Sequence, residues 1–573
     1  MDSRKAGAFL CAALLTFLAG CAGETSSSGG SESAVSSTVA PKPLPAVSYS
    51  EPGEFPIVSD RIELVIFAPA DGQNSREDNA LTLELEEKTG IDISWQIASA
   101  GAFKEKMDLM LVSGDMVDII AAGPSAGNRV SKVEELELAA QGLIIPLEQL
   151  LDTVSVGYQA AFEAMPGLRE YITTPEGHIY SLPNVDGSLH IQYNQKMWLN
   201  TVWLDNLGMA MPTTTEEFYE VLCAFRDQDA NRNGDAADEI PLSTCRSGTG
   251  VELDGFLMAP FQLTPESKLY LEDGAVVFAP VTDDYREGLR YLYRLYAEGL
   301  IAPESFTQER EDQVERNEGG KSAVIGAFPA QRPGYACDLT VYPDNSWRWE
   351  QYQSVPPLTG PDGTCQAAWN PYAMYQTGAA VITGRCAYPE AAFRLIDYLA
   401  TEEGTLRTLE GPEGLGWRWA EEGEKGLDGN QALITQLDDA PDNSGWGQLM
   451  GVVRTPELAA GYTAPQKPYA PGVPPLVGRG IVLYRASLEH QAVAQPRESV
   501  LPELYYTETE YEELSILEDT ILSFAKESLE AFVTGKRSID KEWDSYLRQM
   551  NAIGLERYLE MVQSAYQLET EHR

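Results

Sequence analysis

Short segments between residues 62 and 121 alternate between strand and helix patterns, and this alternation restricts the fold more than any other feature. Apolar runs at residues 62–68 and 117–121, and alternating apolar residues at 91–95, are typical of buried strands. Helical spacing of the apolar residues between them predicts helices, the first ending at Gly90. Strand–helix–strand repeats build mainly parallel sheets, so the sequence predicts an α/β fold. Amphipathic patterns at 285–296 and 514–524 predict later helices, the second near the C-terminus.

Length and charge narrow the class of protein. The body after residue 57 holds roughly 515 residues, which is too many for one hydrophobic core, so two lobes are expected. The chain has 41 basic and 87 acidic residues and a formal net charge of −46. Phosphate binding needs a basic face, so this charge argues against nucleic acid as a partner and against binding flat on anionic lipid. We interpret the acidity as solubility in the medium, with some attraction for divalent cations.

The first 21 residues have the pattern of a secretion signal. Arg4 and Lys5 precede an apolar run that ends in small residues and Cys21, and the run is too short to span a bilayer. A cysteine directly after Ala-Gly resembles the lipobox of bacterial lipoproteins. That resemblance implies that Cys21 is lipidated and becomes the mature N-terminus, on the outer face of the cytoplasmic membrane; an uncleaved or plainly secreted start is the alternative. Residues 22–57 are rich in Ser, Gly and Pro and predict a flexible linker.

The cysteines allow few conclusions. Of seven, Cys11 lies in the signal and Cys21 is the lipidation candidate. Secretion permits disulfides, and Cys223 with Cys245 or Cys337 with Cys365 are candidate pairs, while free buried thiols are the alternative. No CxxC pair is present, so zinc and thioredoxin-like sites lack their usual spacing. The remaining cysteine is Cys386.

Several stretches together resemble the extracellular solute-binding proteins of ABC importers, in particular the large oligosaccharide-binding lipoproteins. The resemblance implies a two-lobed, periplasmic-binding-protein-like fold of type II, with three segments crossing between the lobes and a helical C-terminus. It also implies lobe 1 at residues 58–185 plus 328–400, and lobe 2 at 186–327 plus 401–573. The stretches are EEKTGIDISW (86–95), KMDLMLVSGDMVDII (106–120), GHIYSLPN (177–184), residues 203–225, LYAEGLIAPESF (295–306), GKSAVIGAF (320–328), AAFRLIDYLATEEG (391–404) and residues 532–566.

Two departures from the family are visible. The usual small-Pro-Asp after residue 115 is Met116-Val117-Asp118, which removes a rigid turn but no chemical group. Residues 420–500 match the family poorly, so ligand-binding residues from that stretch are left undefined.

An acidic loop, DQDANRNGDAADE at residues 227–239, has the chemistry of a calcium site. Oxygen side chains at alternate positions around Gly234 suit a hard cation that needs six to eight oxygens. Position twelve of an EF-hand count is Ile240, so the loop is not a standard EF-hand. It resembles the calcium loop of alginate-binding and related lipoproteins, with one extra residue. The expected ligands are Asp229, Asn231, Asn233, the carbonyl of Asp235, and Asp238 with Glu239, either of which would be bidentate; a solvated acidic turn and a register starting at Asp227 are the alternatives.

Enzyme signatures are weak. The four histidines, His178, His190, His490 and His572, form no HExxH motif, and no GxSxG is present. Gly319-Gly320-Lys321-Ser322 resembles the end of a P-loop, but Glu315 stands where the upstream glycine is required. Carboxylate pairs for glycoside hydrolysis could be drawn anywhere among 87 acidic residues, so none is informative.

Candidate ligand-binding residues follow from the resemblance and from sugar chemistry. Aromatic rings stack on the apolar faces of sugars, and amides and carboxylates bond the hydroxyl groups. Trp198, Trp203 and Trp543 are interpreted as packing residues because they lie in helical patterns. The candidate set is Ser125, Asn184, Asp186, Trp369, Asn370, Trp417 and Trp419.

These features predict a non-enzymatic binding protein. The resemblance implies an oligosaccharide or other sugar-like ligand, ABC permease subunits as partners, closure of the lobes around the ligand, and a monomer tethered to the membrane through Cys21. A secreted polysaccharide-degrading lipoprotein and a surface glycan sensor or adhesin are the alternatives, and a peptide ligand stays open.

Overall fold

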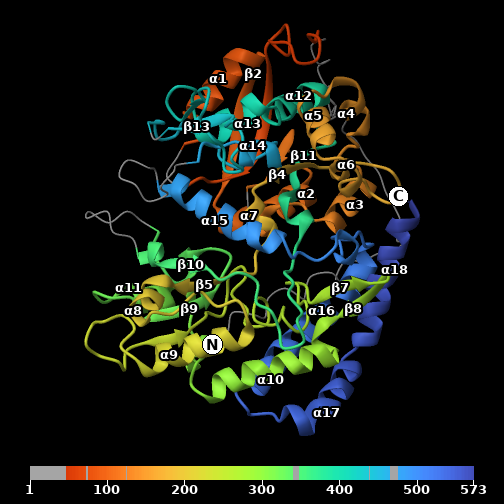
Figure 1. Cartoon of the computed structure of the whole chain (residues 1–573). Coiled ribbons are helices and arrows are strands. Elements are labelled where there is room, and N and C mark those ends of the chain that lie inside the picture. The colour runs from red at the N-terminus through yellow and green to blue at the C-terminus, as the bar shows by residue number, and fades with distance from the viewer. Residues whose placement is uncertain are drawn as a thin grey trace, which may run out of the picture. The chain divides into compact units, whose positions relative to one another are not determined.

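A six-stranded sheet is the centre of one lobe of the structure (Figure 1). The computed structural model describes residues 47–72, 75–123, 125–339, 348–437, 439–464 and 475–572. The strand order is β14-β4-β11-β3-β1-β2. Strand β1 pairs in parallel with β2 and with β3, and β14 pairs in parallel with β4. Strand β11 runs antiparallel to both of its neighbours, β3 and β4. The strands are β1 (Ile62–Pro69), β2 (Ile91–Ala98), β3 (Ile119–Ala121), β4 (Leu182–Asp186), β11 (Tyr375–Ile382) and β14 (Val453–Arg454).

The predicted strand–helix alternation is confirmed by the elements between these strands. Helix α1 (Ala80–Thr89) is capped by the side chain of Asn79 and ends at Gly90 with φ 77°, a left-handed conformation that glycine adopts without strain. Helix α2 (Phe103–Ser113) follows β2. The two faces of β1 belong to different apolar clusters, with Leu64 and Ile66 in one and Phe67 in the other. We call the elements around this sheet the first lobe.

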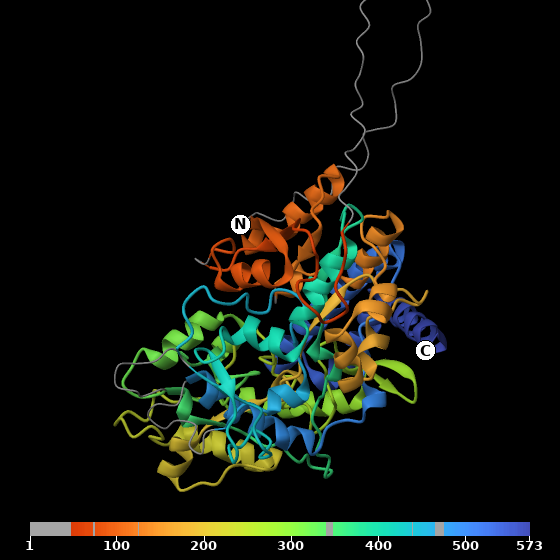
Figure 2. The ribbon, with the colours of Figure 1, turned by 90° about the horizontal axis from the view of Figure 1, so that it is seen from above.

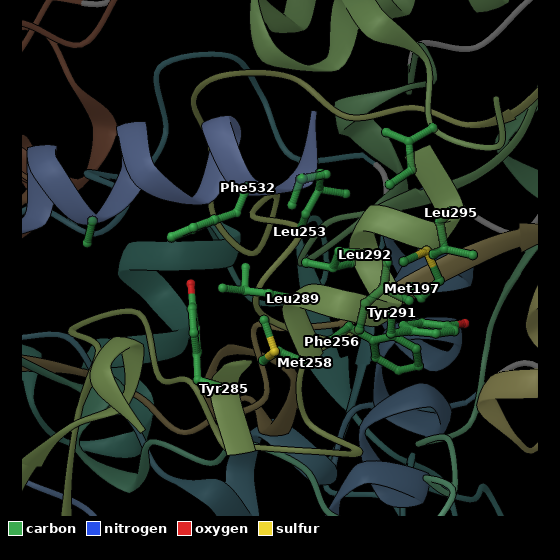
Figure 3. Close-up of a cluster of buried hydrophobic side chains, with 14 of the residues drawn as sticks. Met197, Leu253, Phe256, Met258, Tyr285, Leu289, Tyr291, Leu292, Leu295 and Phe532 are labelled. Carbon is green, nitrogen blue, oxygen red and sulfur yellow. The ribbon is translucent and has the colours of Figure 1, made fainter. Parts of the chain in front are cut away.

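A four-stranded sheet of order β10-β5-β9-β6 is the centre of the second lobe. Its strands are β5 (Met197–Asn200), β6 (Ile240–Leu242), β9 (Ile325–Pro329) and β10 (Tyr352–Ser354). Helices α10 (Asp283–Ala297) and α16 (Glu508–Val533) lie in the expected amphipathic regions. Figure 3 shows their shared core, where Leu289 and Leu292 lie near Phe532. The α/β class and the helical C-terminus are therefore confirmed.

The other helices cover the two sheets. Those of the first lobe are α3 (Lys132–Ala140), α4 (Glu148–Val154), α5 (Gly157–Ala164), α6 (Gly167–Tyr171), α12 (Pro389–Leu399), α13 (Glu402–Glu410) and α14 (Pro456–Ala460). The remainder are α7 (Leu189–Gln192), α8 (Thr201–Leu207), α9 (Thr215–Asp227), α11 (Arg310–Glu318), α15 (Pro475–Gln491), α17 (Ile539–Ala552) and α18 (Leu555–His572). Two hairpins, β7 (Leu269–Glu272) with β8 (Ala275–Phe278) and β12 (Trp417–Trp419) with β13 (Ile434–Gln436), complete the strands. None of the described helices is long and apolar enough to cross a bilayer.

The C-terminal segment returns to the first lobe. Helix α16 contacts α3, and the blue C-terminal end lies beside the orange helices of the first lobe in both views (Figures 1 and 2). The hydroxyl of Tyr505 donates to the carbonyl of Ile172 at 3.4 Å. The ammonium of Lys132 donates to the carbonyls of Tyr171 and Glu503 at 3.1 and 2.9 Å. The C-terminal segment, although its helix α16 packs with α10 in the second lobe, therefore also binds to the first lobe.

Sheet membership differs from the expected division of the chain at two places. Strand β10 lies within residues 328–400 but pairs with β5 in the second lobe, and β14 lies within 401–573 but pairs with β4 in the first lobe. The expected boundaries followed sequence resemblance, whereas strand membership depends on backbone pairing between distant residues.

The last residues of the expected linker are packed. The guanidinium of Arg394 donates to the carbonyls of Ser50 and Glu51 at 2.8 and 2.7 Å, and Ile57 is buried. Apolar and bonding groups at the end of the Pro-rich stretch therefore join the first lobe. The signal peptide, Cys21 and residues 22–46 lie outside the described residues. The five described cysteines, Cys223, Cys245, Cys337, Cys365 and Cys386, are free thiols.

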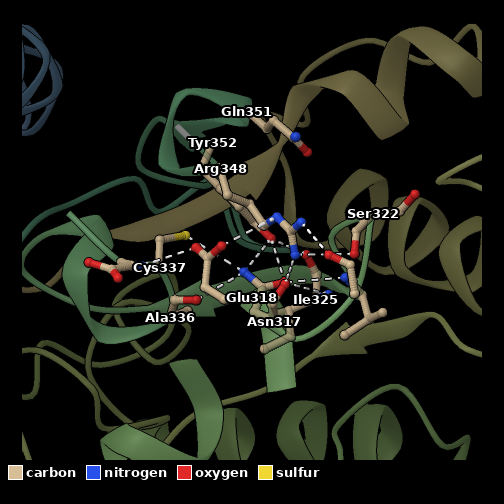
Figure 4. A network of polar contacts seen from close by, with 12 residues as sticks. Asn317, Glu318, Ser322, Ile325, Ala336, Cys337, Arg348, Gln351 and Tyr352 are labelled. Carbon is tan, nitrogen blue, oxygen red and sulfur yellow. Dashed lines mark hydrogen bonds and ion pairs between the residues drawn. The ribbon is translucent and has the colours of Figure 1, made fainter. Parts of the chain in front are cut away.

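Asn317 is the centre of a buried polar network in the second lobe (Figure 4). Its side-chain oxygen accepts from the backbone N–H groups of Val324 and Ile325, both at 3.2 Å. Its amide nitrogen donates to the carbonyl of Ala336 at 2.9 Å and to the hydroxyl of Tyr352 at 3.1 Å. One side chain therefore joins α11 to the start of β9 and to β10.

Replacing Asn317 with alanine is expected to lower the free energy of unfolding by about 3 kcal/mol, because several buried groups lose their partner at once. The measurement is the urea midpoint followed by tryptophan fluorescence. Gln141→Ala, at the exposed end of α3, is the control and should hardly move the midpoint. Equal midpoints for the two variants would contradict the role assigned to Asn317.

Candidate functional site

The chain passes between the two sheets at residues 187–196, which join β4 to β5, and at 355–374, which join β10 to β11. A third connection runs from α14 to α15 and is only partly within the described residues. The first two are bonded together: the Asn370 N–H donates to the carbonyl of Gln192 at 2.9 Å, and the Trp369 indole N–H donates to the Gln192 side chain at 3.2 Å. Helix α15 contacts both α7 and β10, between the sheets in Figure 1.

Two cavities flank these crossing segments. Cavity A, of about 470 Å³, is lined by residues 187–192, by first-lobe residues from 409 to 463, by α15 and by Arg332. Cavity B, of about 510 Å³, is lined by Trp369, Asn370, the start of α3, residues 265–269 and the C-terminal helices. Gln192 lines both.

Strand direction distinguishes the two cavities. Cavity A lies where β4 and β14 of the first sheet reach their carboxyl ends, and Arg332 follows the carboxyl end of β9 in the second sheet. In α/β proteins, ligands bind at the carboxyl ends of parallel strands. A Cβ on Gly187 would lie 2.3 Å from the nitrogen of Pro456, so only glycine lets the first crossing approach α14 here. Cavity A is therefore the better candidate for the ligand site.

The first-lobe wall of cavity A holds an ion pair. The Arg454 guanidinium donates to one carboxylate oxygen of Asp186 at 2.7 and 3.2 Å, and the Ser188 N–H donates to the same oxygen at 3.0 Å. Burial raises the pKa of Asp186, but the charge of Arg454 and these hydrogen bonds outweigh it, and the pKa falls to about 2. Asp186 thus stays ionised and holds Arg454 in place.

A second polar group lies on the same wall. The Tyr462 hydroxyl donates to one oxygen of the Glu410 carboxylate at 2.8 Å, and the Gln436 amide donates to the other at 2.7 Å. Burial lowers the pKa of His190 to about 3, and the charge of buried Lys196 contributes, so this imidazole is neutral. The wall combines guanidinium, carboxylate, amide and phenol groups, which is the mixture that recognises a polyhydroxylated or charged ligand.

The structure separates the predicted ligand-binding residues. Trp369 and Asn370 line cavity B, and Asp186 braces cavity A through Arg454. Ser125 is exposed at the start of the short helix Ala126–Asn128 and lines neither cavity. Trp419 is 47% exposed and lines a different cavity, of about 400 Å³, beside Phe55 and Tyr398.

Two predicted residues have structural contacts instead of the expected place in the cleft. Asn184 accepts from the Val452 N–H at 3.1 Å and donates to the Gln448 carbonyl at 3.1 Å, which fixes the chain before β14. Trp417 is buried against Leu406 and Leu458, and its indole N–H donates to the Gly411 carbonyl at 3.1 Å. Burial of both side chains is decided by segments distant in sequence.

The sequence interpretation missed the charged and aromatic residues of cavity A. Most lie in or near the stretch that matches the family poorly, and a charged residue in sequence is usually at a solvated surface. Arg332 and Arg454 lie at or just after the carboxyl ends of β9 and β14, so knowledge of these strands and their direction would have identified both residues. The missed residues are His190, Arg332, Glu410, Gln436, Arg454, Tyr462, Arg479 and Tyr484.

The acidic loop has the backbone of a cation-binding turn. Both oxygens of Asp229 accept backbone N–H groups, from Asn233 and Gly234 at 3.0 Å, and Gly234 has φ 95°. Asn231 and Asn233 donate their side-chain amides to Asp238 at 3.1 and 2.6 Å. In the described residues, no group of three or more His, Cys, Asp or Glu side chains has the arrangement of a metal site.

One atom in this loop lacks a partner. Glu239 accepts the Asn231 N–H at 3.3 Å through one oxygen, while its other oxygen, Oε2, is buried with no hydrogen bond among the described residues. Asp235 accepts the Ala237 N–H at 3.2 Å, a turn within the loop. Carboxylate and amide oxygens with one unsatisfied buried acceptor fit a hard cation.

Comparison with known proteins assigns the family. The fructooligosaccharide ABC transporter substrate-binding protein FusA of Streptococcus pneumoniae serotype 4 (strain ATCC BAA-334 / TIGR4) is 28% identical over 495 residues, 84% of this chain and 85% of FusA. Lipoprotein LipO of Bacillus subtilis (strain 168) is 25% identical over 272 residues, 45% of this chain and 49% of LipO.

Solved structures agree in fold. A FusA EF-hand mutant in complex with fructo-nystose has a TM-score of 0.65 at 23% identity, covering 89% of this chain and 100% of that one. A Bifidobacterium longum infantis ATCC 15697 protein, described as an HMO binding ABC-transporter associated solute binding protein, has a TM-score of 0.71 at 21% identity, covering 89% and 99%. Residues 73–406 match the sequence profile of one family over more than half of the chain, and the protein therefore belongs to the bacterial extracellular solute-binding proteins.

Proposed function

We propose that this protein is the lipid-anchored, substrate-binding subunit of an ABC importer and that it captures an oligosaccharide in cavity A for delivery to permease subunits. The observation that carries the proposal is the position of cavity A at the carboxyl ends of β4, β14 and β9, between the two sheets. The name of FusA supports an oligosaccharide as the ligand. Binding without turnover is expected, because no catalytic arrangement is needed for this task.

The lining of cavity A suits sugar recognition. Tyr462 and Tyr484 supply aromatic surface, and Gln192, Gln436 and Arg454 supply hydrogen-bonding groups. Its volume lies within the range of small-molecule sites, about 300–1,000 Å³. Ligand contacts from both lobes would favour closure of the lobes. A permease can then distinguish the closed, ligand-bound shape from the shape of the empty protein.

Isothermal titration of the purified protein with a panel of fructooligosaccharides, other oligosaccharides, monosaccharides and peptides tests this function. One glycan class should bind stoichiometrically and be recovered intact. Tyr484→Ala should weaken binding, whereas Trp419→Ala, an exposed aromatic away from cavity A, should not. Absence of binding across the panel would refute the sugar assignment, and shortened glycan would favour a degrading enzyme.

We also propose a structural calcium ion in the loop at residues 229–239. The description of a FusA structure as an EF-hand mutant supports it, as does the unsatisfied Glu239 oxygen. Asp229, Asn231, Asn233 and Asp238 with Glu239 would supply side-chain oxygens and Asp235 a carbonyl, after the asparagine amides turn from donating to accepting. The ion would then hold the end of α9 beside β6.

Calcium at ~100 times its dissociation constant is expected to stabilise the folded protein by ~2.7 kcal/mol, seen as a higher melting temperature than in a chelator. Asp229→Ala should abolish this rise. Asp227→Asn is the matched control, because Asp227 pairs with Arg226 and lies outside the proposed ligand set. Loss of the calcium effect in the Asp227 variant would instead favour the register that starts there.

The membrane anchor is proposed on Cys21 alone, with the name of LipO as support. Replacing Cys21 with serine is expected to move the protein from the membrane fraction to the medium and to abolish incorporation of labelled palmitate. Retention of the variant in the membrane fraction would contradict the anchor.

A further inference from the structure

Cavity A has a charge opposite to that of the whole protein. The chain has 41 basic and 87 acidic residues, yet three arginines, Arg332, Arg454 and Arg479, line the cavity with a single carboxylate, Glu410, among its described lining residues. That carboxylate is already bonded by Tyr462 and Gln436. A positive cavity in so acidic a protein needs a specific reason.

The arginines differ in their partners. Arg454 is paired with Asp186 at 2.7 Å. The guanidinium groups of Arg332 and Arg479, in contrast, form no ion pair or hydrogen bond with the described parts of the chain. Among the described residues, two of the three guanidinium groups in the cavity therefore have no carboxylate partner.

The two unpaired arginines reach the same place from different elements. Arg332 lies just after β9, and Arg479 lies on α15, whose later residues Leu483 and Ala486 pack on the second lobe. Burial lowers the pKa of Arg479, and the positive charge of Arg332 lowers it further, so the two charges are close enough to repel each other. This arrangement costs stability in the absence of a ligand.

Two titratable groups that line the cavity, His190 and Glu410, form no ion pair with these arginines. His190 is neutral and supplies no negative charge, and burial raises the pKa of Glu410 even though Tyr462, Arg454 and Gln436 favour its ionised form. A partly buried guanidinium is stable when an anion pairs with it. Its planar fork of N–H groups matches the oxygens of a carboxylate or sulfate.

We infer that the ligand captured in cavity A carries an anionic group, a carboxylate or a sulfate ester, which binds between Arg332 and Arg479. The inference rests on the proposed function, since it names the class of oligosaccharide: an acidic one, such as a uronic acid or sulfated chain. The paired Arg454 on the opposite wall then donates to the same ligand from the first lobe.

The test compares matched ligands that differ only in charge. A trimeric oligogalacturonide is titrated beside its carboxyl-reduced, neutral counterpart, and a sulfated carrageenan disaccharide beside its desulfated form. The acidic member of one pair should bind about 10- to 100-fold more tightly, as charge-assisted hydrogen bonds imply. Its affinity should fall as salt rises, while binding of the neutral member should not. The pair that responds tells carboxylate from sulfate.

Substitutions assign the effect to the two arginines. Arg332→Gln and Arg479→Gln should each reduce the preference for the acidic ligand, and the double variant should remove it with little change in binding of the neutral one. Arg485→Gln, exposed on the same helix α15 and outside the cavity, should keep the preference. The salt dependence of acidic-ligand affinity, measured on the unmodified protein, is a second readout. It can be used even if a variant fails to fold.

The outcomes separate this inference from the proposed function. Tight, salt-independent binding of neutral oligosaccharides, with no gain from an anionic group, would overturn the inference and leave the oligosaccharide-binding function standing. Failure of every oligosaccharide to bind, neutral or acidic, would overturn both.

Discussion

Replacing Asp397 with alanine is expected to lower the free energy of unfolding by about 3–5 kcal/mol, the typical result of removing one partner from a buried charged interaction. The carboxylate is buried at the end of α12 and accepts from four donors at the start of α5. These are the Ser155 hydroxyl and the Val156 N–H at 2.6 Å, and the N–H groups of Gly157 and Tyr158 at 3.0 Å.

The close packing around Asp397 makes the loss of its carboxylate hard to compensate. The carboxylate satisfies N–H groups that a helix N-terminus leaves free, and its charge faces the positive end of the helix dipole. A Cβ on Gly157 would lie 2.2 Å from the Asp397 carbonyl oxygen, so α5 is close-packed against α12 and water has little room to replace the side chain.

Urea denaturation of Asp397→Ala measures the effect. Asp397→Asn tests the charge: the side chain keeps its shape, but its NH₂ group replaces one acceptor oxygen and faces N–H and O–H groups that also donate. Asp540→Ala is the control: this exposed carboxylate pairs with Arg290 and its loss should hardly move the midpoint. An asparagine variant as stable as the unmodified protein would show that shape, and not charge, is what α5 requires.

Replacing Asp186 with alanine is expected to lower the free energy of unfolding by about 3 kcal/mol at pH 7, because it leaves the largely buried Arg454 guanidinium without its partner. The double variant Asp186→Ala, Arg454→Met should recover much of this loss, since neither charge is then present. A double variant less stable than the single one would contradict the assigned pairing.

The same pair gives the protein an acid-sensitive stability. The pKa of Asp186 is lowered to about 2 in the folded protein, below its value of about 3.9 in an unfolded chain. The unfolded state therefore binds the proton first, and the contribution, about 2 kcal/mol, is present above pH ~4 and is lost as the pH falls toward 2. Denaturation midpoints from pH 5 to pH 2 should fall more steeply for the unmodified protein than for the double variant.

Local sequence patterns predicted much of the fold. The strands predicted at residues 62–68 and 91–95, and the helices predicted between and after them, agree with the structure because apolar periodicity and a glycine C-cap act over one or two turns of chain. The pairing of the strands was harder to predict from local sequence. Strands β10 and β14 are only three and two residues long, and their membership depends on partners more than 150 residues away for β10 (Asn200–Tyr352) and more than 260 for β14 (Asp186–Arg454).

The candidate site was only partly predictable. Asp186 was predicted as a ligand-binding residue because it lies at the first crossing; in the structure it pairs with Arg454, which lines cavity A. Trp417 was expected for its aromatic ring, but burial against Leu406 and Leu458 removes that ring from the cleft. Arg332 and Arg479 stand 147 positions apart, and nothing local in the sequence distinguishes them from arginines at a solvated surface.

The sequence alone determined the α/β class, the helical C-terminus and the resemblance to solute-binding proteins, since these follow from local periodicity and from the order of motifs along the chain. Only the tertiary structure decided which polar side chains face cavity A and which are buried as structural contacts. The physical reason is that burial and charge pairing depend on segments hundreds of residues apart. Arg454 is neutralised by Asp186, whereas Arg332 and Arg479 line the same cavity without forming an ion pair to any described residue.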